Sequence, residues 1–343
     1  MVEGFDTQWS CWLECSKHIG FSVKGDFESC CAPIRHNVLP KIIPDDLPLI
    51  KADIGNHRQL LIPAGKFTMG GDQIFFPTDG EGPSREVFVS DFFIDEIAVT
   101  NKSFSEFIDA TNFKTEAEIL GWSYVFDGFL NEQNSIQKLV GQNNLVPWWQ
   151  AIAGAYWKNP IGDGTIPANF MELPTVHVSW HDADAYSKWR GFTLPTEAQW
   201  EKASRGGLEK MKYPWGNDLL PNNVFMTNIW QGDFPALNTE EDGYFGLAPS
   251  KSFTPNGFGL FNTVGNVWEW TSDFWSARWH KKAASETRND PAGPTKSAGN
   301  RVLKGGSFLC HDSYCNRYRN SARTYNSPSS STSHIGFRCV SSG

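Results

Sequence analysis

Two cysteines near the end of the chain, Cys310 and Cys315, have residue types and a spacing that could do chemistry. They stand five positions apart in the stretch KGGSFLCHDSYCNRYR, which also holds Ser307, His311 and two arginines. A structural zinc site normally needs four ligands, usually in C-x2-C pairs, and this stretch provides neither. Two thiolates alone suit a soft ion of low coordination number, and Cu(I) is the obvious candidate.

The spacing of the pair is consistent with other interpretations. A C-x4-C pair can close a small disulfide, which would be labile in a reducing cytoplasm. Arg317 and Arg319 would favour the thiolate form if their side chains point toward the pair. On spacing alone, inert core cysteines and a reactive or metal-binding pair are therefore both open.

Two loops carry the oxygen-bearing side chains that a hard cation prefers. Residues 228–244 include Asn228, Asp233, Glu240, Glu241 and Asp242. Residues 262–270 include Asn262, Asn266 and Glu269. Calcium takes about six to eight oxygen ligands, many of them backbone carbonyls, and loops of this composition supply them. Neither loop has the EF-hand spacing, so a calcium site and a pair of solvated loops both fit the pattern.

His177 and His181 form an H-x3-H pair, a spacing that can indicate a metal site. Ser179 stands between them as a predicted helix N-cap, so the two histidines need not share a helical face. We interpret them as a cap-region pair. We expect no His-based iron or zinc site, because no third ligand stands nearby.

The elements that must position these residues are short. Three helices are predicted after the N-cap residues Thr100, Ser179 and Thr196, and glycines end the second and third. Strands are predicted in LLIPAGKFTMGG, residues 60–71, and in REVFVSDFFIDEIAVT, residues 85–100. From about residue 208 onward, short strands are expected to alternate with loops rich in Gly, Asn and Asp.

The composition favours an irregular, loop-rich fold. The 343 residues include 15 Trp and 25 Phe together with 31 Gly and 20 Pro, so buried aromatic rings rather than long helices are expected to hold the chain together. A net charge of -8 and a pI near 5.5 argue against nucleic acid or an anionic membrane as a partner. No apolar run approaches the roughly 18 residues that span a bilayer.

The N-terminal region differs from the remainder of the chain. We predict that residues 1–58 form a cysteine-containing extension and that residues 59–343 form the globular catalytic domain. The seven cysteines are an odd number in two clusters, which is unlike the framework of a secreted disulfide-rich protein. The first residues show no basic and apolar leader pattern, so a cytoplasmic location is expected.

At the cysteine pair the sequence closely resembles the formylglycine-generating enzymes, also called sulfatase-modifying factors. The resemblance spans about residues 59–341 and rests on the motifs IPAGKFTMGG, VSWHDADAY, LPTEAQWEKASRGG, YPWGN, NIWQGDFP, EDGYFGLAPS, PNGFGLFNTVGNVWEWTSDFW, LKGGSFLCHDSYCNRYR and HIGFRC. The tryptophan-rich motifs also occur in relatives of other function. The S-x2-C-x4-C element, here Ser307, Cys310 and Cys315, is specific to the generating enzymes. The resemblance implies an irregular α+β fold with little regular secondary structure, related to C-type lectins.

The resemblance also implies an oxidoreductase that acts on a protein cysteine thiol with O2 as acceptor. Members oxidise the cysteine of a C-x-P-x-R segment in an unfolded sulfatase to Cα-formylglycine, so the expected partner is a sulfatase polypeptide or such a peptide. By this resemblance Cys310 and Cys315 would hold Cu(I), the substrate thiol would join as a third ligand, and a thiol would serve as reductant. Ser307 and Trp268 would line the oxygen and substrate pocket. We expect a monomer.

Further site residues follow from the same resemblance. Arg323 would sit at the substrate groove, and His334 replaces an asparagine expected beside the active site. Structural calcium would be held by side-chain and carbonyl oxygens of two loops. The ligands would be Asn228, Ile229, Asp242 and Tyr244 in the first loop, and Asn262, Gly265, Val267 and Glu269 in the second.

The sequence departs from secreted animal members of the family. Ser187, Ser204 and Asn320 stand where those members carry three cysteines, and Cys339 thereby lacks its partner, which fits a cytoplasmic enzyme. One alternative is a catalytically silent paralogue that binds sulfatases without oxidising them, although such paralogues lack the cysteine pair. Another is a related iron-dependent sulfoxide synthase, which would need a His triad that this chain does not show.

The N-terminal region itself contains a C-x-P-x-R segment, Cys31–Arg35. One hypothesis is that this segment is a weak pseudosubstrate, which its tether would keep at high effective concentration. A coincidental match is one alternative. Another is that Cys11, Cys15, Cys30 and Cys31 together bind a metal or shuttle electrons, although their spacing is poor for zinc.

Overall fold

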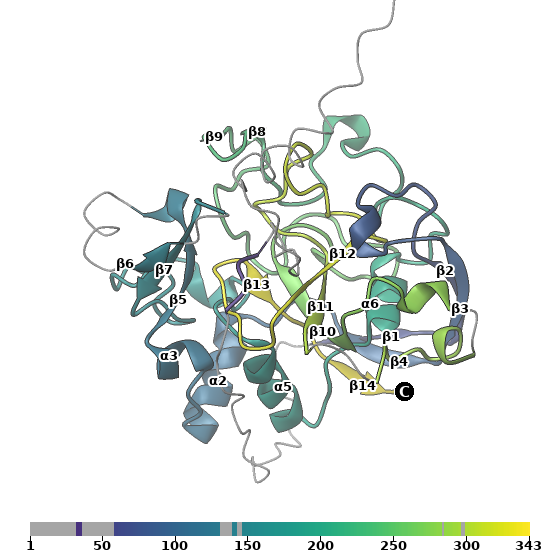
Figure 1. The fold of residues 1–343 in the computed structure, drawn as a ribbon, viewed down its shortest axis with the longest axis horizontal. Helices are drawn as coiled ribbons and strands as arrows, with labels where there is room; N and C mark the ends of the chain where they lie inside the picture. The colour runs from purple at the N-terminus through teal and green to yellow at the C-terminus, as the bar shows by residue number, and fades with distance from the viewer. Residues whose placement is uncertain (1–31, 36–57, 131–138, 143–145, 283–284, 296–298) are drawn as a thin grey trace, which may run out of the picture.

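The described part of the chain folds into short strands and helices joined by long loops (Figure 1). The computed structural model describes residues 32–35, 58–130, 139–142, 146–282, 285–295 and 299–343. The N-terminal cysteines, Cys11, Cys15, Cys30 and Cys31, lie outside the described residues. None of the helices within those ranges is long and apolar enough to cross a membrane. The mixture of short helices and irregular sheets confirms the predicted α+β class.

A four-stranded sheet lies in the middle of the molecule (Figure 1). Its strands, in the order β12-β11-β10-β13, are β10 (Trp268–Phe274), β11 (Arg301–Lys304), β12 (Arg323–Asn326) and β13 (Ile335–Gly336). β10, β11 and β12 run antiparallel, and β13 joins β10 in parallel. Lys304 lies opposite Arg323 in the register of β11 and β12. These two residues therefore form the base of residues 305–322, which we call the cysteine loop.

Four smaller sheets complete the strands of the described chain. They are β1 (Gln59–Ile62) with β4 (Phe92–Asp95) and β14 (Val340–Ser342); β2 (Gly65–Met69) with β3 (Arg85–Val89); β5 (Trp122–Phe126) with β7 (Trp149–Ala153) and β6 (Leu139–Gln142); and β8 (Gly232–Asp233) with β9 (Leu237–Asn238). The strands predicted in residues 60–71 and 85–100 are confirmed, each divided into two. β4 pairs with both β1 and β14, so this sheet joins the start of the body to its C-terminal end.

The helices are few and begin at capping residues. They are α2 (Asn101–Thr111), α3 (Glu116–Leu120), α5 (Trp180–Trp189) and α6 (Glu197–Ser204), with 3₁₀ turns at Pro77–Asp79, Asp127–Phe129, Phe170–Glu172, Pro221–Asn223, Trp279–Lys281 and Ser285–Thr287. The side chains of Thr100, Ser179 and Thr196 each accept the backbone N–H three residues on, which confirms the three predicted starts. α3 was not predicted. Its Thr115–Glu118 capping box is clear, but five residues are too few for a periodic pattern.

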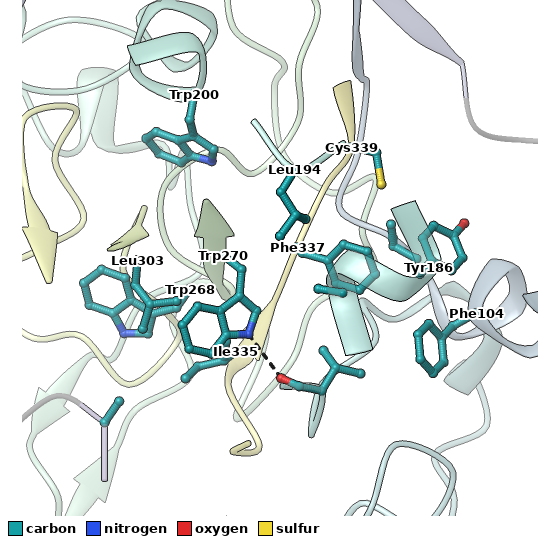
Figure 2. Packing of buried hydrophobic residues seen from close by; sticks show 14 of the residues in the cluster. Phe104, Tyr186, Leu194, Trp200, Trp268, Trp270, Leu303, Ile335, Phe337 and Cys339 are labelled. Carbon is teal, nitrogen blue, oxygen red and sulfur yellow. Dashed lines mark hydrogen bonds between the residues drawn. The ribbon is translucent and has the colours of Figure 1, made fainter. Parts of the chain in front are cut away.

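Buried aromatic rings fill the space against the central sheet (Figure 2). Trp268 and Trp270 of β10 are fully buried and lie beside Leu303 of β11. Phe337 meets Tyr186 of α5 edge to face, with ring centroids 5.3 Å apart. Such aromatic pairs contribute about 0.5–1.5 kcal/mol beyond the area they bury. The expectation that buried aromatic rings hold the fold together is confirmed.

Helix α6 binds the central sheet through buried charges. Glu197 accepts two hydrogen bonds from Arg323 of β12, at 2.7 and 2.8 Å. Glu201 pairs with Lys304 of β11 at 3.0 Å and with Arg205 at 2.8 Å. Burial alone raises the pKa of Glu201, but Lys304 and Arg205 lower it to about 2. The two strand ends that flank the cysteine loop are therefore both held by one helix.

A second buried ion pair joins Arg338 to Glu269 of β10. Arg338 donates through Nε and Nη2 to the two carboxylate oxygens of Glu269, both at 2.7 Å, and both side chains are at most 1% exposed. Trp200 of α6 donates to the same carboxylate at 2.7 Å. Removing one partner of such a pair leaves an uncompensated charge in the interior.

We expect Arg338→Met to lower the free energy of unfolding by about 3–5 kcal/mol, because the Glu269 carboxylate would lose its counter-ion while it stays buried. Urea unfolding followed by tryptophan fluorescence measures the change. Lys66→Met is the control, since Lys66 and Glu86 form an ion pair in which both side chains are 66% exposed. It should change stability by less than about 1 kcal/mol. Equal urea midpoints for the two variants would contradict the prediction.

Candidate functional site

Cys310 and Cys315 lie on the cysteine loop, and each is only 1% exposed. The Cys310 N–H donates to the Ser307 carbonyl at 2.9 Å, and the Ser307 N–H donates to Cys310 Sγ at 3.4 Å. The Cys315 N–H donates to the His311 carbonyl at 2.9 Å. Neither cysteine belongs to a disulfide. The loop therefore keeps two reduced thiols away from water, and its backbone hydrogen bonds fix the turn between them.

The entry to the cysteine loop depends on Gly306. Its φ of 75° lies in the left-handed region that glycine adopts without strain. A Cβ at this position would lie 3.0 Å from the backbone N of Tyr318 and 3.1 Å from the carbonyl C of Arg317. The start of the loop can therefore lie against its end only if residue 306 has no side chain.

The two arginines that follow the pair bind carboxylates from the other end of the body. Arg317 Nε lies 2.6 Å from Asp79, and Arg319 Nη1 lies 2.7 Å from Glu81. Arg317 also donates to the Cys315 carbonyl at 3.3 Å. Both guanidinium charges are thus paired and pin the loop to residues 79–81. That they favour the thiolate form of the cysteines stays a prediction.

Arg323 lies in the buried charge network rather than on an open surface. Besides its two bonds to Glu197, it donates through Nη1 to the carbonyls of Asp79 and Ser276, at 3.1 and 2.9 Å. It also stacks on the ring of Trp275, 4.3 Å from the centroid. These contacts give it a structural role at the base of the cysteine loop. The substrate contact predicted for it stays a prediction, and would require this network to open.

Trp268 and His334 contact each other through their backbones. Trp268 belongs to the same buried cluster as Cys310 and Cys315. Its backbone N–H donates to the His334 carbonyl at 2.9 Å. Its indole Nε1 has no hydrogen-bond partner among the described residues. The His334 ring lies 4.5 Å from the ring of Trp149. Ser307 thus contacts Cys310, and His334 contacts Trp268, which shares one buried cluster with the two cysteines. The active-site roles of these residues stay predictions.

The donor set of the pair suits a soft metal ion. Among the described residues, no group of three or more His, Cys, Asp or Glu side chains is arranged to hold a metal. No third side chain of these four types therefore joins the two sulfurs in the part of the chain that the structure describes. Two sulfur ligands in an apolar setting would match the preference of Cu(I) for soft ligands and low coordination.

In the first calcium loop, the Asp242 carboxylate and the Ile229 carbonyl both contact the side-chain nitrogen of Gln231. Asp242 accepts from the backbone N–H of Ile229 and of Tyr244, both at 3.0 Å, and from Gln231 Nε2 at 2.8 Å. The same Gln231 nitrogen contacts the Ile229 carbonyl. Asn228 Oδ1 is buried without a hydrogen-bond partner. A buried oxygen without a partner, on the same loop as a carboxylate, is a group that a hard cation would satisfy.

The second calcium loop fits less completely. Asn262 Oδ1 is buried without a hydrogen-bond partner, as a metal ligand would be in the absence of its ion. Gly265 lies in the left-handed region, with φ 71°, and donates to the Gly305 carbonyl next to the cysteine loop. Both oxygens of Glu269, however, already accept from Arg338 and Trp200. An ion at this loop would have to share Glu269 with that pair.

His177 and His181 bind separate partners. His177 is fully buried and hydrogen-bonds Ser123 through Nδ1 at 2.8 Å, whereas His181 Nδ1 lies 3.1 Å from Glu116. Burial lowers the pKa of His177 to about 3, so it is neutral at physiological pH. The two rings do not form one site, in agreement with the cap-region interpretation.

Sequence reasoning missed the acidic face of α6. Glu197 and Glu201 stand four positions apart on a helix that also buries Trp200, and this i, i+4 pair was the available signal. Ser204 of the same helix binds the cysteine loop. Its hydroxyl donates to Asn320 Oδ1 of the cysteine loop at 2.9 Å. A neutral hydrogen bond therefore links helix and loop at this point.

Comparison with known proteins agrees with this geometry. The profile of a family described as "Sulfatase-modifying factor enzyme 1-like domain" matches residues 49–342. The chain is 53% identical over 280 residues to the formylglycine-generating enzyme of Thermomonospora curvata, covering 81% of this chain and 91% of that one. It is 44% identical over 289 residues to the inactive Cα-formylglycine-generating enzyme 2 of Mus musculus, covering 82% and 84% of the two chains.

A solved structure shows the same fold at lower sequence similarity. PvdO from Pseudomonas aeruginosa aligns with a TM-score of 0.60 and 22% identity, over 83% of this chain and 94% of that one. At this identity the likeness concerns the fold alone.

We expect calcium to stabilise the protein, because an ion that binds only the folded state adds to the free energy of unfolding. At about 100 times the dissociation constant the gain is about 2.7 kcal/mol, which corresponds to a rise of roughly 4–5 °C in Tm for a domain of this size. Differential scanning fluorimetry after prolonged chelation, and again after adding Ca²⁺, measures it. Asn262→Ala should reduce the increment.

Magnesium is the control, since it demands a smaller octahedral site and should not restore the Tm. Identical melting curves before and after exhaustive chelation would contradict the prediction that the two loops bind calcium.

Proposed function

Because the chain belongs to the sulfatase-modifying factor enzyme 1-like family, we propose that it is a formylglycine-generating enzyme. It would convert the cysteine of a C-x-P-x-R segment in a sulfatase to Cα-formylglycine. The observation that carries the proposal is the buried, reduced pair Cys310 and Cys315 on a loop held at both ends. The relative from Thermomonospora curvata, 53% identical, bears this name.

The overall chemistry is an oxidation of the substrate carbon. The Cβ–S bond of the substrate cysteine breaks, the carbon becomes an aldehyde, and the sulfur leaves as hydrogen sulfide with two electrons given up. O2 takes up four electrons and becomes water and the aldehyde oxygen, so a thiol reductant must supply the other two. The protein is therefore proposed as an oxidoreductase that consumes O2 and a thiol.

Cys310 and Cys315 would hold the copper ion. When bound, Cu(I) would supply the redox chemistry that couples O2 to the substrate thiol. Burial of the two sulfurs excludes water and competing ligands from the site. The Ser307 hydroxyl accepts from the Leu309 N–H at 3.3 Å, which leaves its own proton for a polar group in the pocket. Trp268 would form a rigid wall of the pocket for oxygen and substrate.

The proposal also includes structural calcium, a polypeptide partner, an oligomeric state and a cellular location. Calcium would be structural, with Asn228 and Asn262 as ligands whose buried oxygens have no other partner. The partner would be an unfolded sulfatase polypeptide, recognised as a short peptide. We propose a monomer in the cytoplasm, in keeping with the odd number of cysteines and the three described cysteines outside any disulfide.

A second candidate function is a catalytically silent protein that binds sulfatases. Its support is the 44% identity to a relative from Mus musculus that is named inactive. The intact pair Cys310 and Cys315 favours the enzyme, because a protein that only binds has no need of two buried thiols. A wild-type protein that binds a C-x-P-x-R peptide but never changes its mass would favour the silent protein.

We expect Cys310→Ser and Cys315→Ser to reduce turnover by roughly 10³-fold or more, because groups that act as one unit fail together. The assay incubates each protein with a C-x-P-x-R peptide, Cu(I), a thiol and air, and follows peptide mass. Cys339→Ser is the matched control, because Cys339 is also buried and burial raises the pKa of its thiol far above the ordinary value. It should keep most of the activity. Near wild-type turnover in Cys310→Ser or Cys315→Ser would refute the proposal that the two cysteines hold the copper ion.

A further inference from the structure

Four residues of the N-terminal region, Ala32–Arg35, are packed against the C-terminal part of the body. In Figure 1 this short purple segment lies beside β13 and the yellow C-terminal chain. Ala32 is fully buried and belongs to the core cluster that also contains Trp268, Cys310 and Cys315. Arg35 is only 3% exposed. The segment thus occupies an interior position although it is almost 300 residues away in sequence from the chain it contacts.

The Arg35 side chain is held by a set of neutral acceptors. Its Nη1 donates to the Ser329 carbonyl at 2.9 Å, and its Nη2 donates to the Trp122 carbonyl at 2.9 Å and to Ser331 Oγ at 3.1 Å. The guanidinium lies over the Trp122 ring, 4.2 Å from its centroid. A flat cation between an indole face and a row of oxygens is a specific fit for arginine.

Side chains of the C-terminal region hydrogen-bond the backbone of Ala32–Arg35. The Arg35 N–H donates to Ser330 Oγ at 2.7 Å, and its carbonyl accepts from Ser327 Oγ at 3.0 Å. Asn326 Nδ2 donates to the Pro33 carbonyl at 3.1 Å. Pro33 has no N–H that would need a partner when it is buried. The contacts therefore select an arginine within an extended peptide, and they tolerate a proline two positions before it.

The residues that hold the segment are continuous with the candidate active site. We call Trp122, Asn326, Ser327 and Ser329–Ser331 the arginine cradle. From the cradle the chain runs directly to His334, whose carbonyl accepts from the Trp268 N–H. Ser331 also hydrogen-bonds Ser123 of β5, at 2.8 Å, so the cradle is supported from behind. A peptide seated in it lies with its N-terminal end toward the cluster of the cysteine pair.

We propose that Ala32–Arg35 occupies the substrate groove of its own chain and competes there with external C-x-P-x-R peptides. The inference rests on the proposed function for the identity of those peptides. The residue before Ala32 in the sequence is Cys31, which lies outside the described residues and completes the C-x-P-x-R pattern. Because the segment belongs to the same chain, its effective concentration is on the order of 1 mM. If it docks with a dissociation constant of about 0.1 mM, external peptides bind roughly ten-fold more weakly than they otherwise would.

Arg35→Ala in the full chain tests the proposal. The probe is a fluorescein-labelled peptide that copies residues 29–37 with serine at both cysteine positions, so that binding needs neither copper nor turnover. Fluorescence anisotropy should show the Kd falling about ten-fold in Arg35→Ala. Arg58→Ala, which removes an exposed arginine, is the matched control and should bind like the wild type. Ala32→Asp is a second variant, since a carboxylate at a fully buried position should expel the segment without touching the cradle.

Each outcome has one meaning. Tighter peptide binding by Arg35→Ala and Ala32→Asp supports the proposal. An unchanged Kd overturns it, and an unchanged Kd with lower urea stability assigns the segment a structural role instead. Loss of cooperative unfolding in both variants also overturns it, because a competitor can leave without unfolding the body. Turnover of a cysteine-containing peptide is measured in parallel, so a failure of the proposed function is seen separately from a failure of the competition.

Discussion

Glu197 and Glu201 point from helix α6 into an interior where a carboxylate is strongly unfavourable without a cation beside it. The cations are Arg323 and Lys304, which lie opposite each other on β12 and β11. Charge neutrality in the interior therefore sets the distance between the two ends of the cysteine loop. The strands, the helix and the loop cannot shift independently, because any separation would leave a buried charge alone.

The other contacts of the site depend on this base. Because the loop leaves and rejoins the sheet at fixed points, Gly306 can lie against residues 317 and 318, and the arginines that follow can reach Asp79 and Glu81. Aromatic packing provides burial but little direction, since rings tolerate several edge and stacked arrangements. In a fold with so little regular secondary structure, directional ion pairs hold the thiols in place within the volume that the aromatic rings fill.

Local features of this chain could be predicted from sequence, and distant pairings could not. Thr100, Ser179 and Thr196 reveal the helix starts because a cap and its N–H donor are only three residues apart. The cysteine pair was found because both members lie within one short motif. The partners of Arg317 and Arg319 are 238 residues away along the chain, and nothing in the local pattern points to them. The pairing of Arg323 with Glu197 was likewise not predictable, because 126 residues separate the two along the chain.

The link between Ser204 and Asn320 is a hydrogen bond, which a reductant does not break. This affects which solution conditions destabilise the fold. None of the three described cysteines is in a disulfide, so a thiol reductant at working concentration has no cross-link to break among the described residues. The stability of this part of the chain depends instead on pH. The stabilisation from Glu201 is complete above its unfolded pKa near 4.5, and it is lost as the pH falls toward about 2, where the carboxylate is protonated in the folded chain. Within the described residues, acid rather than a reductant is therefore the condition that removes a stabilising interaction.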